Sequence, residues 1–365
     1  MFEPSWTSPP GETALDLMVE QGLSPTRLAE AFDWTDYEIT SLLSGRTAVD
    51  GEIAGLLSRF VGGTPEFWCE RERHFSNSIA RVAEAADSQT VRQWLTSLPA
   101  RDMEKRGWIA SQLDQEKRLC DALRFFGVTS IDRWQEKYQN WGRQVPLRTS
   151  GAFELSVHSL AAWLRRGEVQ ASVDRLSEWN PELYGDSLFA IRELTRKRDP
   201  QTFLPSLRER CGKAGVAVVI AETPAKCPVS GATFFGNTGN PVVMISCRHK
   251  TDDQFWFTFF HESAHLLLHS EEDCFLELEH ECGSDTEREA NAFAAETLVP
   301  RKYHQEMFSL GSNAKKIIRF ARDVGVSPGI VVGQMQYYGI LRHNQQRRLK
   351  RSYSLQDGVV SLERR

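Results

Sequence analysis

The sequence has no long hydrophobic run. Nowhere in its 365 residues is there a stretch of about 18 apolar residues, the minimum for a helix that crosses a bilayer. The opening segment, MFEPSWTSPPGE, also lacks the basic start and apolar centre of a secretory signal peptide. We therefore expect a protein without membrane spans that stays in the cytoplasm.

Cysteine is scarce, and its spacing is irregular. The chain contains 7 cysteines, an odd number, and none of them belongs to a CxxC pair. This pattern argues against a disulfide framework and against a cysteine zinc site. Cys274 and Cys282 flank His280 and could form a redox switch or supply a metal ligand, or they could be ordinary loop or core cysteines.

Positive charge is nearly missing from the N-terminal part of the chain. Residues 1–80 carry 5 basic against 13 acidic side chains, whereas residues 301–365 carry 13 basic against 4 acidic ones. If the protein contacts nucleic acid electrostatically, the C-terminal end is therefore the better candidate. Its tail, LRHNQQRRLKRSY, includes Arg347 and Arg348, which could meet DNA phosphates or form a solvated charged face.

The length of the chain predicts two or three domains. The fold class we expect is mainly α with a small antiparallel β-sheet, together with an all-α helix-turn-helix domain. The predicted order is a helix-turn-helix domain at 1–80, a helical connector at 81–200, an α+β core at 201–300, and C-terminal helices with a basic tail at 301–365.

The first 46 residues have the pattern of short helices joined by tight turns. Ser24 precedes a proline at the first helical position, and Thr35 with Glu38 forms a capping box. The second and third helices carry apolar stripes that can pack together. This arrangement indicates helix-turn-helix architecture.

DNA binding by this domain is one of two interpretations. The side chains placed to enter a DNA groove include Asp36, Tyr37 and Thr40, flanked by Glu38, and Arg46 and Arg27 lie nearby to meet phosphates. Acidic groups that face DNA repel it. A role in binding another protein is therefore an open alternative.

Near residue 200 the helical pattern gives way to β-rich runs. VAVVIAE, ATFFG and PVVMIS are separated by the turn-forming segments TPAKCPVSG and NTGN. The short connection between the second and third runs favours an antiparallel hairpin. Thr251 and Gln254 then form a predicted capping box at the start of the next helix.

That helix contains the segment TFFHESAHLLLH. On a helix, residues four apart share a face, so His261 and His265 can both reach one zinc ion. Glu262 projects beside such an ion, where a carboxylate can serve as the general base of zinc-dependent hydrolysis. The pattern HExxH by itself also occurs without this function, so a third ligand is the test.

The third ligand is expected downstream of the HExxH helix. His269 lies eight residues after His261, about 12 Å along a helix, which is too far for one ion. In TEREANAFAAETLVP, Glu287 shares a helix face with Asn291 and can point inward, whereas Glu289 is turned about 200° away. We therefore predict Glu287 as the third ligand, and His269 and Asn291 as residues that could support the site.

FWFTFFHESAHLLLH followed by EREANAFAAETLVP resembles the ImmA/IrrE family of cytoplasmic metallo-endopeptidases. The resemblance implies that His261, His265 and Glu287 hold zinc, that Glu262 is the base, and that a zincin-like α+β peptidase domain covers 201–300. The N-terminal 80 residues look like a HigA-type regulator, a Cro/repressor-like helix-turn-helix domain.

Three residues outside the motif could stabilise an oxyanion, namely His280, Tyr303 and His304. None of them has a spacing that requires this role.

The resemblance implies a regulatory endopeptidase that cleaves a repressor or antitoxin-like protein in stress, phage or toxin-antitoxin responses. The substrate is expected to bind extended, as an added strand on the sheet edge at 231–246. A toxin, DNA and a second copy of the chain are further candidate partners. The alternative is a DNA-binding regulator or antitoxin whose zinc domain is a sensor without proteolysis.

Overall fold

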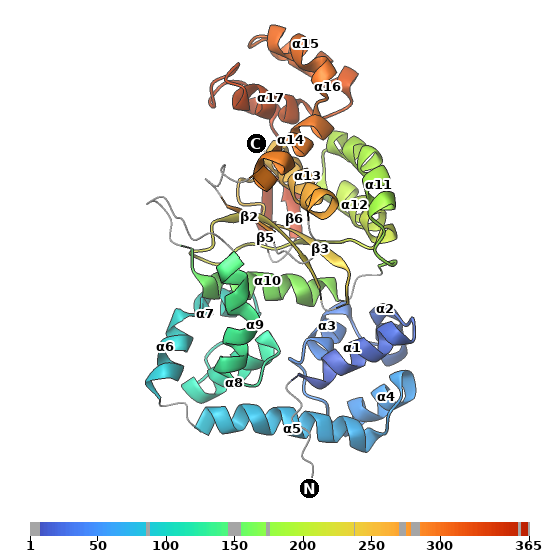
Figure 1. Cartoon of the computed structure of the whole chain (residues 1–365), viewed down its shortest axis with the longest axis vertical. Helices are drawn as coiled ribbons and strands as arrows, with labels where there is room; N and C mark the ends of the chain where they lie inside the picture. Colours follow the sequence, from blue (N-terminus) through green and yellow to red (C-terminus); the bar gives the residue numbers. More distant parts are fainter. Residues whose placement is uncertain are drawn as a thin grey trace. The chain divides into compact units, whose positions relative to one another are not determined.

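The structure, a computed structural model, describes residues 8–84, 88–144, 155–172, 176–236, 238–269, 275–278, 285–356 and 359–363. It divides into two compact units (Figure 1). The N-terminal unit comprises Met1–Arg175 with the segments Pro224–Cys227 and Gly236–Thr238, and the C-terminal unit comprises the remainder of 176–365. Helices predominate and the sheets are small, which confirms the predicted mainly α class with an α+β domain and a helical region.

The N-terminal unit is built from ten helices among the described residues. They are α1 Pro10–Glu20, α2 Pro25–Phe32, α3 Asp36–Leu43, α4 Gly51–Val61, α5 Pro65–Glu84, α6 Gln89–Ser97, α7 Ala100–Lys105, α8 Gln115–Phe126, α9 Ile131–Gln144 and α10 Val157–Ala171. The capping box at the start of α3 is confirmed, because Thr35 accepts a hydrogen bond from the Glu38 amide and the Glu38 carboxylate accepts one from the Thr35 amide. Helices α2 and α3 start where the sequence predicted.

A buried arginine and a partly buried one, both from the predicted connector, hold the turn that follows α3. Arg165 of α10 donates to the carbonyl oxygen of Ser44 at 3.2 Å, and Arg124 of α8 donates to that of Gly45 at 3.0 Å. The Arg165 side chain also pairs with Glu168 at 2.9 Å. The first 80 residues and helices α6–α10 therefore belong to one compact unit, whereas the sequence placed a border between them.

This packing changes the expectation for DNA contacts by α3. Helix α3 packs against α1, α2 and α10, and Thr40 is only 9% exposed. Tyr37 is 61% exposed, and the half-buried Arg46 lies over its ring, 6.0 Å from the centroid. The prediction that Thr40 reaches DNA is wrong, because the side chain is used in packing.

The C-terminal unit begins at Leu176, so α11 belongs to it and not to a separate connector. Its helices are α11 Pro181–Glu193, α12 Pro200–Lys213, α13 Asp252–Leu268, α14 Asp285–Leu298, α15 His304–Ser309, α16 Ala314–Val324 and α17 Pro328–Tyr337, with short 3-10 turns η1 Leu194–Arg196, η2 Arg301–Tyr303 and η3 Arg347–Leu349. Its strands are β1 Ala217–Ile220, β2 Val229–Phe235, β3 Pro241–Ile245, β4 Phe275–Leu278, β5 Tyr353–Gln356 and β6 Val359–Leu362.

The larger sheet has the strand order β1-β3-β2-β4. The predicted hairpin is confirmed, since β2 and β3 pair antiparallel with Gly231 opposite Ile245. β1 and β3 pair in parallel. The position between β1 and β2 in the sheet is occupied by β3, the strand that follows β2 in the sequence. Strand β4 was missed by the sequence analysis, since a run of four residues is too short to show a clear alternation.

The sheet order also corrects the predicted binding edge at 231–246. Strand β2 is paired with β3 on one side and with β4 on the other, and β3 is paired with β1 and β2. In the described part of the sheet, both strands are therefore paired on both sides over most of their length. The outer strands of the described sheet are β1 and β4.

Helix α13 is the central element of the C-terminal unit. It packs against β2, β3, α14 and α17 (Figure 1). Its buried aromatic side chains, among them Trp256 and Phe259, belong to the main core. Thr251 is the N-cap residue, but its side chain makes no capping hydrogen bond, so the capping box predicted there is wrong. The start of the helix is held in another way.

Two aspartates in the first turn of α13 bind the C-terminal segment. The Asp252 carboxylate accepts hydrogen bonds from the Arg351 amide at 2.9 Å and from the Ser327 hydroxyl at 2.8 Å. Asp253 pairs with Lys350 at 2.6 Å. Part of the basic tail is therefore built into the fold, and the chain continues from it into the hairpin β5–β6.

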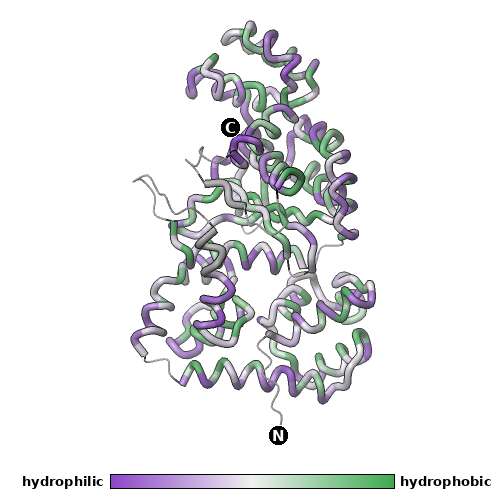
Figure 2. Tube along the Cα trace, in the orientation of Figure 1, coloured by the Kyte–Doolittle hydropathy of each residue, from purple (hydrophilic) through white to green (hydrophobic). Residues whose placement is uncertain are grey.

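Helices α15–α17 complete this unit beyond α14. The tube over these helices alternates between purple and green in Figure 2, as expected for helices that pack one face and expose the other. On α16 the exposed face carries Lys315, Lys316, Arg319 and Arg322, which are part of the C-terminal positive charge. No helix in the described part of the chain is long and apolar enough to cross a membrane.

Candidate metal centre

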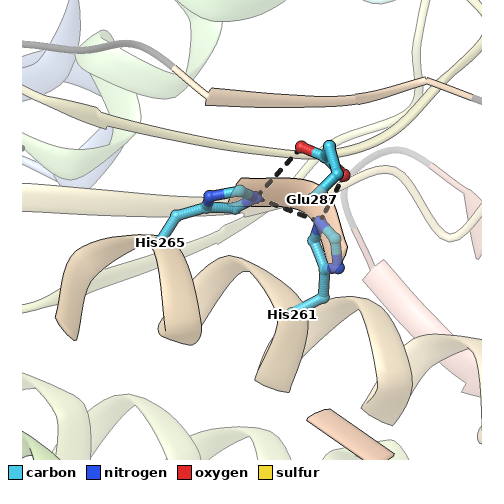
Figure 3. Close-up of side chains that lie close together, drawn as sticks. All are labelled: His261, His265 and Glu287. Carbon is cyan, nitrogen blue, oxygen red and sulfur yellow. Dashed lines mark hydrogen bonds and ion pairs between the residues drawn. The ribbon is translucent and has the colours of Figure 1, made fainter. Parts of the chain in front are cut away.

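Three side chains from two helices converge at one point of the C-terminal unit (Figure 3). His261 and His265 lie one turn apart on α13, and their Nε2 atoms are 3.1 Å from each other. Glu287, in the first turn of α14, places Oε2 3.3 Å from Nε2 of His261 and Oε1 3.3 Å from Nε2 of His265. Both histidines are buried, and Glu287 is mostly buried.

These distances fit a shared zinc ion. With zinc–nitrogen and zinc–oxygen bonds of about 2.0–2.1 Å, two donors of a tetrahedral site lie roughly 3.3 Å apart. Taken pair by pair, the N–N separation of 3.1 Å and the two N–O separations of 3.3 Å, which involve different oxygens of Glu287, match this spacing. Two imidazoles and one carboxylate are also a donor set found in hydrolytic zinc enzymes. The residues therefore suit zinc in both chemistry and spacing.

Hydrogen bonds from α14 and from the end of α13 orient the two imidazoles. Nδ1 of His261 lies 3.2 Å from Oδ1 of Asn291, an oxygen that can only accept, so this nitrogen carries the proton. Nδ1 of His265 lies 2.9 Å from Nδ1 of His269, whose Nε2 is 3.3 Å from the Glu289 carboxylate. With each Nδ1 engaged outward, each Nε2 lone pair faces the shared point.

The protonation states also suit metal binding. Burial is the largest influence on His265 and lowers its pKa, although Glu287 acts in the opposite direction. Burial alone would raise the pKa of Glu287, but its interactions with His261 and His265 outweigh burial and lower the value to about 2. A neutral imidazole and an ionised carboxylate are the forms that bind a metal.

Glu262 directly follows His261 on α13 and is fully buried. Its Oε2 accepts a hydrogen bond of 2.7 Å from the Thr233 hydroxyl on strand β2. Thr233 was not predicted from the sequence. Gly231 offered a signal, because a glycine inside a strand often marks the close approach of another group.

The other predicted site residues lie in different parts of the structure. His269 and Asn291 hydrogen bond to the two histidines, and Glu289, the rival third ligand, contacts His269 instead. His280, Cys274 and Cys282 lie outside the described residues.

Tyr303 and His304 lie beyond the far end of α14. Glu287 sits in the first turn of this helix, about 17 Å from its last residue at 1.5 Å per residue. Tyr303 packs against Phe320. His304 packs against Phe308, and its Nε2 donates a hydrogen bond of 3.0 Å to the carbonyl oxygen of Val299. The structure therefore does not bring these two residues to the centre.

The comparison with protein families agrees with this location. Residues 211–334, about a third of the chain, match the model of the IrrE N-terminal-like domain, Peptidase_M78. No curated protein matches the chain. The matched region contains the whole described centre and supports a metallopeptidase in general, a class that implies a bound metal. It does not include the N-terminal unit's helices, so their resemblance to HigA-type regulators stays a prediction.

Proposed function

We propose that this chain is a regulatory zinc-dependent endopeptidase that cleaves a repressor or antitoxin-like protein. The observation that carries the proposal is the convergence of His261, His265 and Glu287, with Glu262 next to His261 on α13. A purely structural zinc site has no need for a neighbouring general base. The family match over residues 211–334 supports the coarser class, a metallopeptidase.

The proposed chemistry assigns a separate task to each side chain. His261, His265 and Glu287 would hold zinc, which when bound supplies a Lewis acid for the scissile carbonyl and makes water more acidic. Glu262 would accept the proton of the attacking water on its carboxylate and deliver it to the leaving amine nitrogen. Asn291 and His269 would keep the two imidazoles in the tautomer and orientation that leave Nε2 available.

A peptide substrate would bind in extended form at an outer strand. Since β2 and β3 are paired on both sides, the earlier expectation of strand addition at 231–246 is withdrawn. Strand β4 is an outer strand, pairs with β2 and packs against α13, the helix with the two histidines. We therefore propose β4 as the strand to which an extended peptide adds.

The test is a comparison of wild type with Glu262→Gln in cells of the source organism under stress. New protein N-termini would be labelled and identified by mass spectrometry, and the intact mass of the chain itself would be measured. We expect at least one new terminus, in a regulator or in the chain's own N-terminal unit, with wild type alone. Identical termini in both cultures, with equal zinc content, would exclude proteolysis as the function.

The same experiment separates the alternative function. A DNA-binding regulator or antitoxin with a zinc sensor would regulate equally well with Glu262→Gln, and would lose regulation with His265→Ala because the metal is lost. Whether the partners include DNA, a toxin or a second copy of the chain stays a prediction.

A further inference from the structure

We infer that Thr233 is a positioning residue, which holds the Glu262 carboxylate in the orientation that a general base needs. We also infer that Gly231 leaves the space that this carboxylate occupies beside strand β2. The inference rests on the proposed function and assigns a role to strand β2. Residues 231 and 233 are two apart, so they face the same side of the strand, toward α13.

Thr233 makes a directed contact with Glu262. Its hydroxyl lies 2.7 Å from Oε2 and 3.2 Å from the backbone carbonyl oxygen of Glu262. A hydroxyl has one proton to donate, and the shorter contact to a carboxylate oxygen is the stronger hydrogen bond. Thr233 is itself buried in the strand, so its side chain cannot swing away without a change in the core.

Gly231 supports the same carboxylate from the backbone. A Cβ atom at this position would lie 2.4 Å from Oε1 and 2.8 Å from Cγ of Glu262, and 2.6 Å from Cγ2 of Thr258. These distances are far below van der Waals contact, so only glycine fits beside the carboxylate in this position. Glu262 has no room to retreat, because it is fully buried.

Together the two residues fix the Glu262 side chain at both ends of its carboxylate. Oε2 is held by the hydroxyl of Thr233, and Oε1 lies against the Gly231 backbone. A general base must lie within hydrogen-bond distance of the proton that it takes, and small displacements of a reacting group reduce the rate strongly. Loss of the Thr233 hydroxyl should therefore affect the base while the three metal ligands, none of which it contacts in the described hydrogen bonds, stay in place.

The experiment compares three zinc-loaded variants of the full chain. Thr233→Val removes the hydroxyl at nearly constant volume, Thr233→Ser keeps it, and Thr195→Val is the matched control. Thr195 is also 0% exposed, but its hydroxyl has no hydrogen-bond partner in the described structure. Each variant would be measured for zinc content, for its crystal structure, and for the affinity of acetohydroxamate, a small zinc-directed probe that also contacts a neighbouring carboxylate.

We expect one zinc per chain in all three variants. In Thr233→Val the Glu262 carboxylate should rotate or shift relative to the two Nε2 atoms, and acetohydroxamate should bind about tenfold more weakly, whereas Thr233→Ser and Thr195→Val should match wild type. Once a substrate is known, kcat should fall roughly 10- to 100-fold in Thr233→Val with KM nearly unchanged.

A Glu262 carboxylate at its wild-type position in the Thr233→Val crystal structure would overturn the inference, whatever the activity. This outcome differs from failure of the proposed function, which would appear as unchanged cleavage by Glu262→Gln. If Thr233→Val lost its zinc, Thr233 would be a structural support of the metal site and the inference would also be wrong.

Discussion

The N-terminal and C-terminal units each bury a cluster of ionisable side chains, and the two clusters differ in how their groups meet. Around Arg165, positive meets negative: the guanidinium pairs with Glu168 and Glu12 and donates to the carbonyl oxygens of Phe125 and Ser44. The buried charge of Arg165 therefore has its ionic and hydrogen-bonding partners within the cluster, as a buried charge in a structural core must.

The cluster in the C-terminal unit is arranged differently. The Nε2 atoms of His261 and His265 face each other at 3.1 Å, and both face the Glu287 carboxylate. With both Nδ1 atoms engaged elsewhere, three groups present lone pairs to one point. Such a set is complementary to a cation. The comparison teaches that direction of donors and acceptors, and not burial alone, distinguishes a functional centre from a structural one.

The largest effect should come from removing the charged member of the centre. Glu287→Gln should reduce zinc affinity by more than the roughly 10- to 100-fold that loss of an outer hydrogen-bond partner costs. The matched control is Glu289→Gln, which lies two residues away and contacts only His269 among the residues of the centre. Competition with a chelator measures the affinity. Full zinc in Glu287→Gln with loss in Glu289→Gln would reverse the ligand assignment.

A change in the cluster around Arg165 should lower the free energy of unfolding and leave the zinc content unchanged. Arg165→Met leaves Glu168 buried with less compensation, and we expect a loss of about 3–5 kcal/mol in the free energy of unfolding. Arg133→Met, which breaks an exposed pair with Glu136 in the same unit, should cost at most about 1 kcal/mol. Urea titration of both variants provides the measurement. Equal losses of unfolding free energy in the two variants would mean that the buried pair stabilises the protein no more than the exposed pair does.

A third buried group, Asp252, should make stability depend on pH. Burial and the charge of Asp253 raise its pKa from 3.8 to about 6, although Ser327 and Arg351 act against this. The folded chain therefore holds the proton more tightly than the unfolded chain, so this stabilisation is present below about pH 4 and is lost as the pH rises through about 6.

The amount at stake is about 3 kcal/mol, since one pKa unit corresponds to about 1.4 kcal/mol. Asp252→Asn should flatten the fall in unfolding free energy between pH 4 and pH 7, measured by urea titration at each pH. The other charged groups at this place, Asp253, Lys350 and Arg351, are present in both proteins, so the difference between the two curves reports Asp252 together with its interactions with them. Parallel curves for the variant and wild type would contradict the assignment.

The smallest effect should come from the hydrogen bonds that orient the imidazoles. Asn291→Ala removes the acceptor at Nδ1 of His261 and should weaken zinc binding about 10- to 100-fold without loss of the fold. Asn291→Asp keeps an acceptor and should retain affinity. Unchanged affinity in Asn291→Ala would show that packing alone holds the ring.

Much of the centre could be predicted because its geometry is local. His261 and His265 share a face through the pitch of a single helix, and the same pitch directs Glu287 inward and Glu289 away from the pair. The hairpin β2–β3 was also predictable, since its short connection leaves few other pairings. Each of these features depends on residues within a few turns or one loop of each other.

The features that the sequence did not predict depend on distant segments. Thr233 meets Glu262 across 29 residues, and Asp252 meets Arg351 across 99. Thr40 has the spacing of a DNA-contacting residue, yet the packing of α1, α2 and α10 around α3 buries it. The sequence by itself determined which side chains could bind a metal, because helical periodicity is a property of neighbours along the chain. Only the tertiary structure decided which strand holds the base and which polar groups are buried, because these contacts form when the sheet, the helices and the C-terminal segment pack together.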